Sequence, residues 1–144
     1  MDSLNILILC TGNTCRSQMA EVFLQSLDSR LKVFSAGTKH GNQVHQLTVK
    51  VMAEKGFDLS KNKPKSVDNF IDMSFDYVIT VCEGAKEACP VFTGKVKHHL
   101  HIGFEDPAAF QGDIAEKLNI FRQVRDKIFD KFKWFYQKII ENYD

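Results

Sequence analysis

The chain has 144 residues, of which 44% are hydrophobic and 26% are charged, and its formal net charge is +1. This length and composition predict one globular domain spanning residues 1–144. The near-zero net charge provides no field for nucleic acid or an acidic membrane surface. The opening residues, MDSLNILILC, lack the basic start of a secretory signal, and no apolar run approaches membrane-spanning length. We therefore expect a cytoplasmic protein with reduced cysteines and with no nucleic-acid or membrane partner.

The first half of the chain alternates between strand and helix patterns. Residues 4–9 form a nearly continuous apolar run, which suits a strand buried on both faces. Residues 16–27 carry apolar side chains at helical spacing, and residues 32–36 are typical of a second strand. Residues 46–55 again have helical spacing and stop at Gly56, which suits a helix C-terminus.

The second half continues the alternation and fixes the fold class. Residues 69–73 suit one helical turn, and the β-rich stretch FDYVITV predicts a strand over residues 75–81. Residues 96–102 predict a fourth strand, and residues 114–143 form one or two amphipathic helices. Strands that alternate with helices predict an α/β domain, with a four-stranded parallel sheet flanked by helices on both faces.

Two cysteines each follow a predicted strand directly. Cys10 comes after the first strand and Cys82 after the third. The carboxyl ends of parallel strands meet at one edge of the sheet, and ligands bind beyond that edge. The sequence therefore predicts that the two thiols share a site.

Residues 10–17, CTGNTCRS, join the first strand to the first helix. Gly12 and Asn13 best tolerate positive φ, which turns successive amides inward to make an anion cradle at the helix N-terminus. Arg16 adds a planar charged fork that fits a tetrahedral oxyanion. The same surroundings favour the thiolate of Cys10, to which Ser17 could donate a hydrogen bond. The expected oxyanion-binding residues are Thr11, Gly12, Asn13, Thr14, Cys15, Arg16 and Ser17.

Spacing alone also allows interpretations of these residues that involve no catalysis. Cys10 could be a buried cysteine before an ordinary helix. A zinc site is disfavoured by the spacing of the four cysteines, which are Cys10, Cys15, Cys82 and Cys89. His99 and His101 share a face of a predicted strand, but no third ligand accompanies them, so a rim-facing strand is the better interpretation. We predict no metal site.

The stretch CTGNTCRSQMAE closely resembles the phosphate-binding loop of the low-molecular-weight protein tyrosine phosphatase superfamily. Late in the chain, GFEDPAAF supplies the Asp-Pro pair of that superfamily, Asp106 and Pro107, whose aspartate is the general acid. The resemblance covers nearly the whole chain. It implies the superfamily's fold and a catalytic domain.

Two branches of the superfamily compete for this sequence. The phosphatases usually follow the Asp-Pro pair with a tyrosine, and this chain has Ala108. The thioredoxin-coupled arsenate reductases carry two cysteines after the third strand, and VCEGAKEACP supplies Cys82 and Cys89. The resemblance therefore implies an arsenate reductase, with a phosphotyrosine phosphatase as the alternative. A non-catalytic oxyanion or phosphopeptide binder is disfavoured, because a binder needs neither the thiol nor the acid.

The resemblance also implies roles for the site residues. Cys10 attacks arsenate held by the loop and Arg16, and Asp106 protonates the departing oxygen. Cys82 then attacks the sulfur of Cys10, arsenite leaves, and Cys89 moves the disulfide to Cys82–Cys89, which thioredoxin reduces. This cycle requires no cofactor, and no exposed apolar stripe in the sequence demands a partner subunit, so we expect a monomer.

Members of the family sometimes hold a potassium ion near the loop. Asn13 and Glu21 match parts of that pattern, but the position of the remaining acid falls near Lys65, whose ammonium could replace the ion. We therefore predict no potassium site. We assign Cys15 to packing, and His101 resembles a histidine that the reductases often carry before the Asp-Pro pair.

Cys82 and Cys89 lie seven positions apart. A helix between them would separate their Cα atoms by about 10 Å, whereas a disulfide tolerates at most about 7 Å. We therefore expect this segment to change shape, with Gly84 as its hinge and Pro90 limiting the spread of the change.

Overall fold

A computed structural model of the chain describes residues 3–143. The four strands predicted from the sequence are present, and each differs from its predicted bounds by at most one residue at either end. They are β1 (Leu4–Cys10), β2 (Leu31–Gly37), β3 (Phe75–Thr80) and β4 (Val96–His101). All pairs are parallel and the order is β2-β1-β3-β4, so the predicted parallel sheet is confirmed.

The helices follow the sequence pattern less evenly. The first helix agrees to the residue and the last is a single helix, whereas the second ends two residues before its predicted end. A short helix separates Cys82 from Cys89. The helices are α1 (Arg16–Leu27), α2 (Gln46–Ala53), α3 (Glu83–Glu87) and α4 (Ile114–Tyr143), with 3₁₀ turns η1 (Val67–Asn69) and η2 (Pro107–Ala109). The helical turn predicted over residues 69–73 is observed over Val67–Asn69, so the two share only Asn69.

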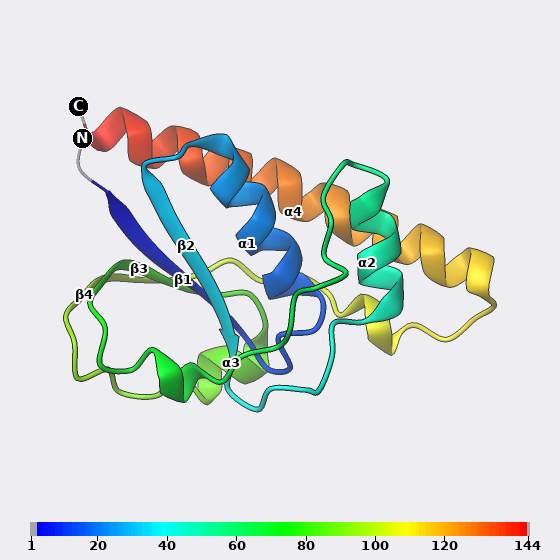
Figure 1. The fold of residues 1–144 in the computed structure, drawn as a ribbon, viewed down its shortest axis with the longest axis horizontal. Coiled ribbons are helices and arrows are strands. Elements are labelled where there is room, and N and C mark those ends of the chain that lie inside the picture. Colours follow the sequence, from blue (N-terminus) through cyan, green and yellow to red (C-terminus); the bar gives the residue numbers. More distant parts are fainter. Residues whose placement is uncertain (1–2, 144) are drawn as a thin grey trace.

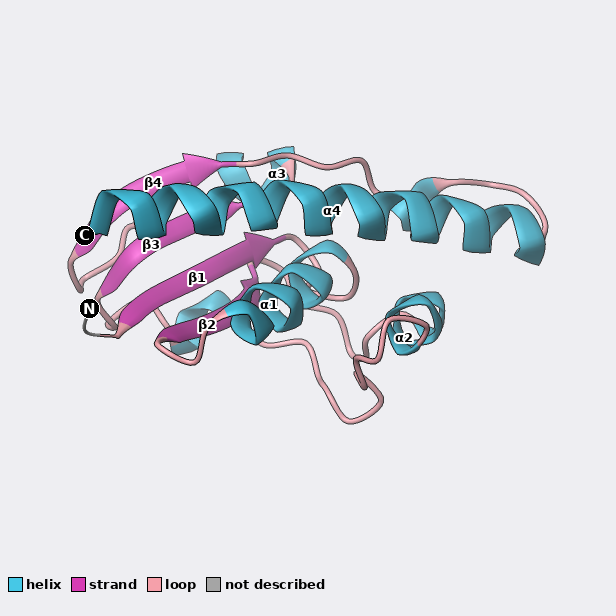
Figure 2. Cartoon of the chain, turned by 90° about the horizontal axis from the view of Figure 1, so that it is seen from above, coloured by secondary structure: helices cyan, strands magenta, loops and turns pink. Residues whose placement is uncertain are grey.

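Helices cover both faces of the sheet, as predicted. Figures 1 and 2 show α1 and α4 on one face, with α4 running along the whole sheet, and α3 with η1 on the other face. The central strand β1 is apolar on both faces because both are covered, and its residues from Ile6 to Cys10 are all buried. Phe121 and Phe132 of α4 complete the core. Within residues 3–143, no helix combines the length and apolar character needed to cross a membrane.

The carboxyl ends of β1 and β3 lie side by side in the centre of the sheet. Leu9 of β1 pairs with Thr80 of β3, so the residues that follow these strands leave the sheet together. The loop that leads from β1 to α1 and the turn that leads from β3 to α3 therefore meet. This junction is where the sequence predicts the shared site.

Candidate active site

The loop between β1 and α1 points its carbonyl groups outward. Four of them accept hydrogen bonds from backbone N–H groups of the segment after β2. The pairs are Thr38 to Cys10 (3.1 Å), Lys39 to Thr11 (2.9 Å), Gly41 to Gly12 (2.9 Å) and His45 to Thr14 (3.0 Å). Since the C=O and N–H of a trans peptide point in opposite directions, the N–H groups of residues 11, 12, 13 and 15 point inward. The Thr11 N–H bonds to Cys10, and no acceptor within residues 3–143 binds the other three, so they are available to an anion.

Asn13 holds the shape of this loop. It is fully buried and has a φ of 58°, the positive value predicted from the sequence. Its Nδ2 donates to Ser17 Oγ (2.7 Å) and Ser35 Oγ (2.9 Å). Its Oδ1 accepts from the Lys65 backbone N–H (2.9 Å) and from Gln18 Nε2 (3.1 Å). Every polar atom of the side chain is thereby used, so Asn13 supports the loop and its amide group is not directed at a ligand.

Two expectations about the loop are wrong. Gly12 does not have positive φ, because the turn needs a single left-handed residue and Asn13 supplies it. Ser17 Oγ accepts from Asn13, and within the described residues no hydrogen bond joins it to Cys10. Ser17 therefore belongs to the support of the loop. Thr14 and Cys15 lie in the loop as predicted, and Cys15 precedes the first residue of α1.

Arg16 is the first residue of α1, and its guanidinium lies beside Asp106. Its Nη1 donates to the Phe104 carbonyl (3.0 Å), and its Nη2 lies 3.8 Å from Asp106 Oδ2. The side chain is only 13% exposed, and its buried Nε–H has no partner among the described residues. A buried donor without a partner is costly, so this Nε–H is a second observation in favour of an anion at the loop.

Cys10 and Cys82 lie together, as predicted. Cys10 Sγ donates to Cys82 Sγ across 3.7 Å, Thr11 Oγ1 lies within hydrogen-bond distance of Cys82 Sγ (3.3 Å), and Cys82 Sγ accepts from the Ala85 N–H (3.4 Å). Both thiols are buried. The two thiols therefore contact each other in a site from which water is largely excluded.

The hydrogen bond between the two thiols shifts the pKa values of Cys10 and Cys82 in opposite directions. The hydrogen bond to Cys82, together with burial, raises the pKa of Cys10 despite the opposing charge of Arg16. The hydrogen bond from Cys10, with further donation from Thr11 and Ala85, lowers the pKa of Cys82. The hydrogen bond to Cys82 and burial therefore oppose the Cys10 thiolate that the sequence favours, while the charge of Arg16 supports it. The sequence could not show this, because it depends on how α3 packs against the loop.

Asp106 lies at the mouth of the loop, where the sequence places the general acid. It precedes η2, and its Oδ1 accepts from the Ala108 N–H (3.0 Å). Its side chain is 44% exposed, and Oδ2 is the oxygen that faces Arg16. Pro107 at the first position of η2 fixes the turn that presents this carboxyl group.

Cys89 is not brought to the other two thiols. It follows α3, is half-buried beside the Pro90 carbonyl (Sγ to O, 3.7 Å), and burial raises its pKa. The structure contains no disulfide among its four cysteines. Gly84 was predicted to be a hinge, but it lies within α3, where an added Cβ would come within 2.6 Å of Thr11 Oγ1. The missing side chain therefore lets α3 approach Thr11, and the hinge remains a prediction for the disulfide form.

The remaining predicted positions show no metal site. Cys15 is buried, and burial raises its pKa, which suits the packing role expected for it. Lys65 Nζ lies 3.3 Å from Glu21 Oε1, so the lysine ammonium occupies the place that the sequence assigned to it. Over residues 3–143, no three histidine, cysteine or acidic side chains gather closely enough to hold a metal ion.

Two functional contacts were missed from the sequence. Thr11 was expected only as a loop residue, whereas its hydroxyl reaches Cys82. His45 Nδ1 accepts from the Leu47 N–H (3.1 Å) at the start of α2, and His45 lines a small pocket together with Thr14. A histidine before a predicted helix is the signal that could have identified this cap.

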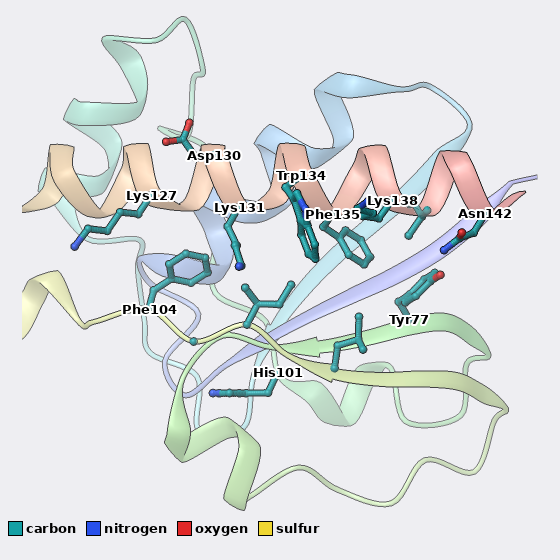
Figure 3. A pocket seen from close by; sticks show the side chains of 14 residues that line it. Tyr77, His101, Phe104, Lys127, Asp130, Lys131, Trp134, Phe135, Lys138 and Asn142 are labelled. Atoms are coloured by element: carbon teal, nitrogen blue, oxygen red, sulfur yellow. The ribbon is translucent and has the colours of Figure 1, made fainter.

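A large groove of the described chain is separate from this site. It has a volume of about 890 Å³ and lies between β4 and α4, with Trp134 and Lys131 on its helical wall (Figure 3). None of residues 10–17 lines it. Phe104 links the two places, because it lines the groove and its carbonyl accepts a hydrogen bond from Arg16 Nη1.

A thiol nucleophile, an inward-facing amide loop, an arginine and an aspartate at the mouth define the class of a cysteine-dependent phosphatase-like enzyme. The family described as low molecular weight phosphotyrosine protein phosphatase matches residues 5–143, and the chain belongs to this family. Among curated relatives, the chain is 43% identical over 132 residues to an arsenate reductase of Oceanobacillus iheyensis, covering 90% of this chain and 93% of that protein. It is 42% identical over 137 residues to an arsenate reductase of Bacillus subtilis, covering 94% and 96%.

Solved structures agree with the family. A structure described as an arsenate reductase in oxidized state has a TM-score of 0.78 and 27% identity, and covers 94% of this chain and 98% of its own. A tyrosine phosphatase from Erwinia amylovora has a TM-score of 0.75, with coverage of 94% and 93%. The latter is only 18% identical and therefore supports the fold alone.

Proposed function

We propose that this protein is an arsenate reductase, a single catalytic domain of residues 1–144 that uses Cys10, Cys82 and Cys89 in turn and needs no metal or cofactor. The observation that carries the proposal is the 3.7 Å contact between Cys10 and Cys82. Ester hydrolysis has no use for a second thiol against the nucleophile. Transfer of two electrons to a bound oxyanion uses a second thiol, which Cys82 would supply from within the chain.

In the first step, arsenate lies against the inward N–H groups of the loop and the Arg16 guanidinium. Cys10 passes its proton to the Cys82 thiolate along their hydrogen bond and attacks arsenic. A Cys10–arsenic bond forms, an arsenic–oxygen bond breaks, and Asp106 donates a proton to the departing oxygen. The positive loop and Arg16 stabilise the charge that develops on the remaining oxygens.

In the second step, Cys82 returns to its thiolate form and attacks Cys10 Sγ. The Cys10–Cys82 disulfide forms, the electron pair of the sulfur–arsenic bond remains on arsenic, and arsenite leaves after taking up the proton of Cys82. The hydrogen bonds from Thr11 and Ala85 favour the thiolate that this step requires. A third step, in which Cys89 attacks Cys82, would release Cys10 for the next cycle.

The reductant that completes the cycle is, in our proposal, thioredoxin. Cys89 is partly exposed, and the nearby Val91 is 90% exposed. A dithiol protein could therefore contact an apolar surface next to the Cys89 thiol. Disulfide exchange requires the attacking thiolate to reach a sulfur atom directly. The proposal includes a monomeric enzyme in the cytoplasm, where thiols stay reduced.

The alternative is a phosphotyrosine phosphatase, which is favoured by one feature. Cys10, Arg16 and Asp106 are arranged for attack on a phosphate ester whether or not Cys82 takes part. Arsenite formation with thioredoxin, thioredoxin reductase and NADPH should be compared with hydrolysis of an aryl phosphate by the same preparation. Steady arsenite formation supports the reductase, and ester hydrolysis without any arsenite overturns it.

A further inference from the structure

One histidine outside the reacting groups joins three elements beside Cys82. His101 ends β4, and its Nδ1 lies 2.8 Å from the hydroxyl of Thr80, the last residue of β3. Its Nε2 lies 3.2 Å from Oε1 of Glu83, the first residue of α3. Gly103 makes room for the ring, since a Cβ there would come within 2.9 Å of Nε2.

The two contacts of the imidazole differ in how easily they can be broken. Figure 3 shows the His101 ring on the side of β4 away from α4, and its Thr80 partner is buried. The Glu83 side chain, in contrast, is 72% exposed. Glu83 can therefore leave His101 and be solvated at once, without stranding a buried charge. The ring stays attached to the sheet while its contact with α3 is releasable.

Release matters because α3 cannot persist when its flanking cysteines join. At a helical rise of about 1.5 Å per residue, the seven positions from Cys82 to Cys89 span about 10 Å, beyond the roughly 7 Å that a disulfide allows. Its backbone bonds, from the Lys86 N–H to the Cys82 carbonyl (3.1 Å) and from the Ala88 N–H to the Gly84 carbonyl (3.0 Å), must be broken. Any contact made only with the helical form favours the dithiol over the disulfide.

We propose that His101 is a positioning residue that holds the first turn of α3 through Glu83, and that this pair separates when the Cys82–Cys89 disulfide forms. The inference rests on the proposed relay. In that step the Cys89 thiolate attacks Cys82 Sγ, the Cys82–Cys89 bond forms and the Cys10–Cys82 bond breaks. Cys10 leaves as a thiolate, and the proton lost by Cys89 passes to solvent. The exchange is balanced and needs no further oxidant.

Isosteric variants separate the two contacts of the ring. His101→Gln keeps an amide nitrogen near the position of Nε2 and can still donate to Glu83. His101→Asn keeps an amide near Nδ1, facing Thr80, and cannot reach Glu83. Glu83→Ala removes the partner. His98→Asn is the matched control, because His98 lies on the same strand and stacks on Tyr77 (ring centroids 4.9 Å apart).

Hydrogen exchange of the reduced protein tests the contact without any substrate. We expect amides of residues 83–88 to exchange about threefold to tenfold faster in Glu83→Ala and His101→Asn, because one hydrogen-bonded contact is lost from a marginal helix. His101→Gln and His98→Asn should stay close to wild type. Amides of β1 report whether a variant has loosened the whole fold. Equal exchange of residues 83–88 in all variants overturns the inference.

The thiol–disulfide equilibrium of Cys82 and Cys89 supplies the second measurement. In a Cys10→Ser background, equilibration with oxidised and reduced dithiothreitol gives the fraction of the Cys82–Cys89 bond by peptide mapping. His101→Asn should shift this equilibrium toward the disulfide by about threefold to tenfold relative to His101→Gln. An unchanged equilibrium contradicts the inference. If both measurements respond while wild type forms no arsenite, the proposed function fails and the positioning role of His101 stands.

Discussion

Replacing Thr11 with valine tests how the second thiol is activated. Valine has nearly the shape of threonine but lacks the hydroxyl that lies 3.3 Å from Cys82 Sγ. The substitution leaves the bonds from Cys10 and from the Ala85 N–H in place. It therefore removes one of the three hydrogen bonds that stabilise the Cys82 thiolate.

The expected magnitude follows from this geometry. Hydrogen bonds to charged groups contribute about 1.5–3 kcal/mol, and a long bond to sulfur lies below that range, at roughly 1 kcal/mol. One pKa unit corresponds to about 1.4 kcal/mol, so the pKa of Cys82 should rise by roughly 0.5–1 unit in Thr11→Val. The direction follows from the lowered pKa of Cys82 in the native site. At a pH near that pKa, the variant should carry less thiolate and react more slowly.

The assay is the pH dependence of Cys82 alkylation by iodoacetamide, read by peptide mass. Thr11→Ser, which keeps the hydroxyl, is the matched control and should follow the wild-type curve. Thermal unfolding of all three proteins shows whether either substitution disturbs the fold. A Thr11→Val curve that overlays wild type would refute the idea that this hydroxyl stabilises the thiolate.

The remaining predictions concern the other reacting groups. Asp106→Asn should slow the first chemical step by about 10²–10⁴-fold in single-turnover kinetics; sulfate affinity by calorimetry should hold, and its loss would make Asp106 structural. Arg16→Lys should weaken sulfate binding by about tenfold or more because it lacks the planar fork; equal affinity would leave binding to the loop amides. Cys89→Ser should form about one arsenite per enzyme and then stop as the Cys10–Cys82 disulfide; sustained turnover with thioredoxin would contradict the relay.

Local signals made the central part of the fold predictable. The apolar run of β1 requires cover on both faces, and the apolar stripe of residues 16–27 fixes α1 to the residue. Parallel strands then bring Cys10 and Cys82 to one edge of the sheet, so their proximity follows from topology. The contact between the two thiols was predictable because each cysteine directly follows a strand predicted from the sequence.

Other features depend on contacts between segments distant in sequence. The five residues of α3 are too few to show a helical period. From the sequence, a helix between Cys82 and Cys89 is therefore only a hypothetical case. The opposite pKa shifts of Cys10 and Cys82 could not be predicted for a related reason. They depend on hydrogen bonds from Thr11 and Ala85, which exist only because α3 packs against the loop. Spacing along the chain carries no information about that approach.

Gly84 shows why a glycine in a mobile-looking segment is ambiguous. Glycine serves both where φ must be positive and where two segments pass too closely for a side chain. The sequence predicts a hinge at Gly84, and in this structure the residue also meets the second need, because it lies in α3 where an added Cβ would come within 2.6 Å of Thr11 Oγ1. A side chain at this position would displace the hydroxyl that reaches Cys82. Because Gly84 has no side chain, α3 can lie close to Thr11, whose hydroxyl contacts Cys82 Sγ.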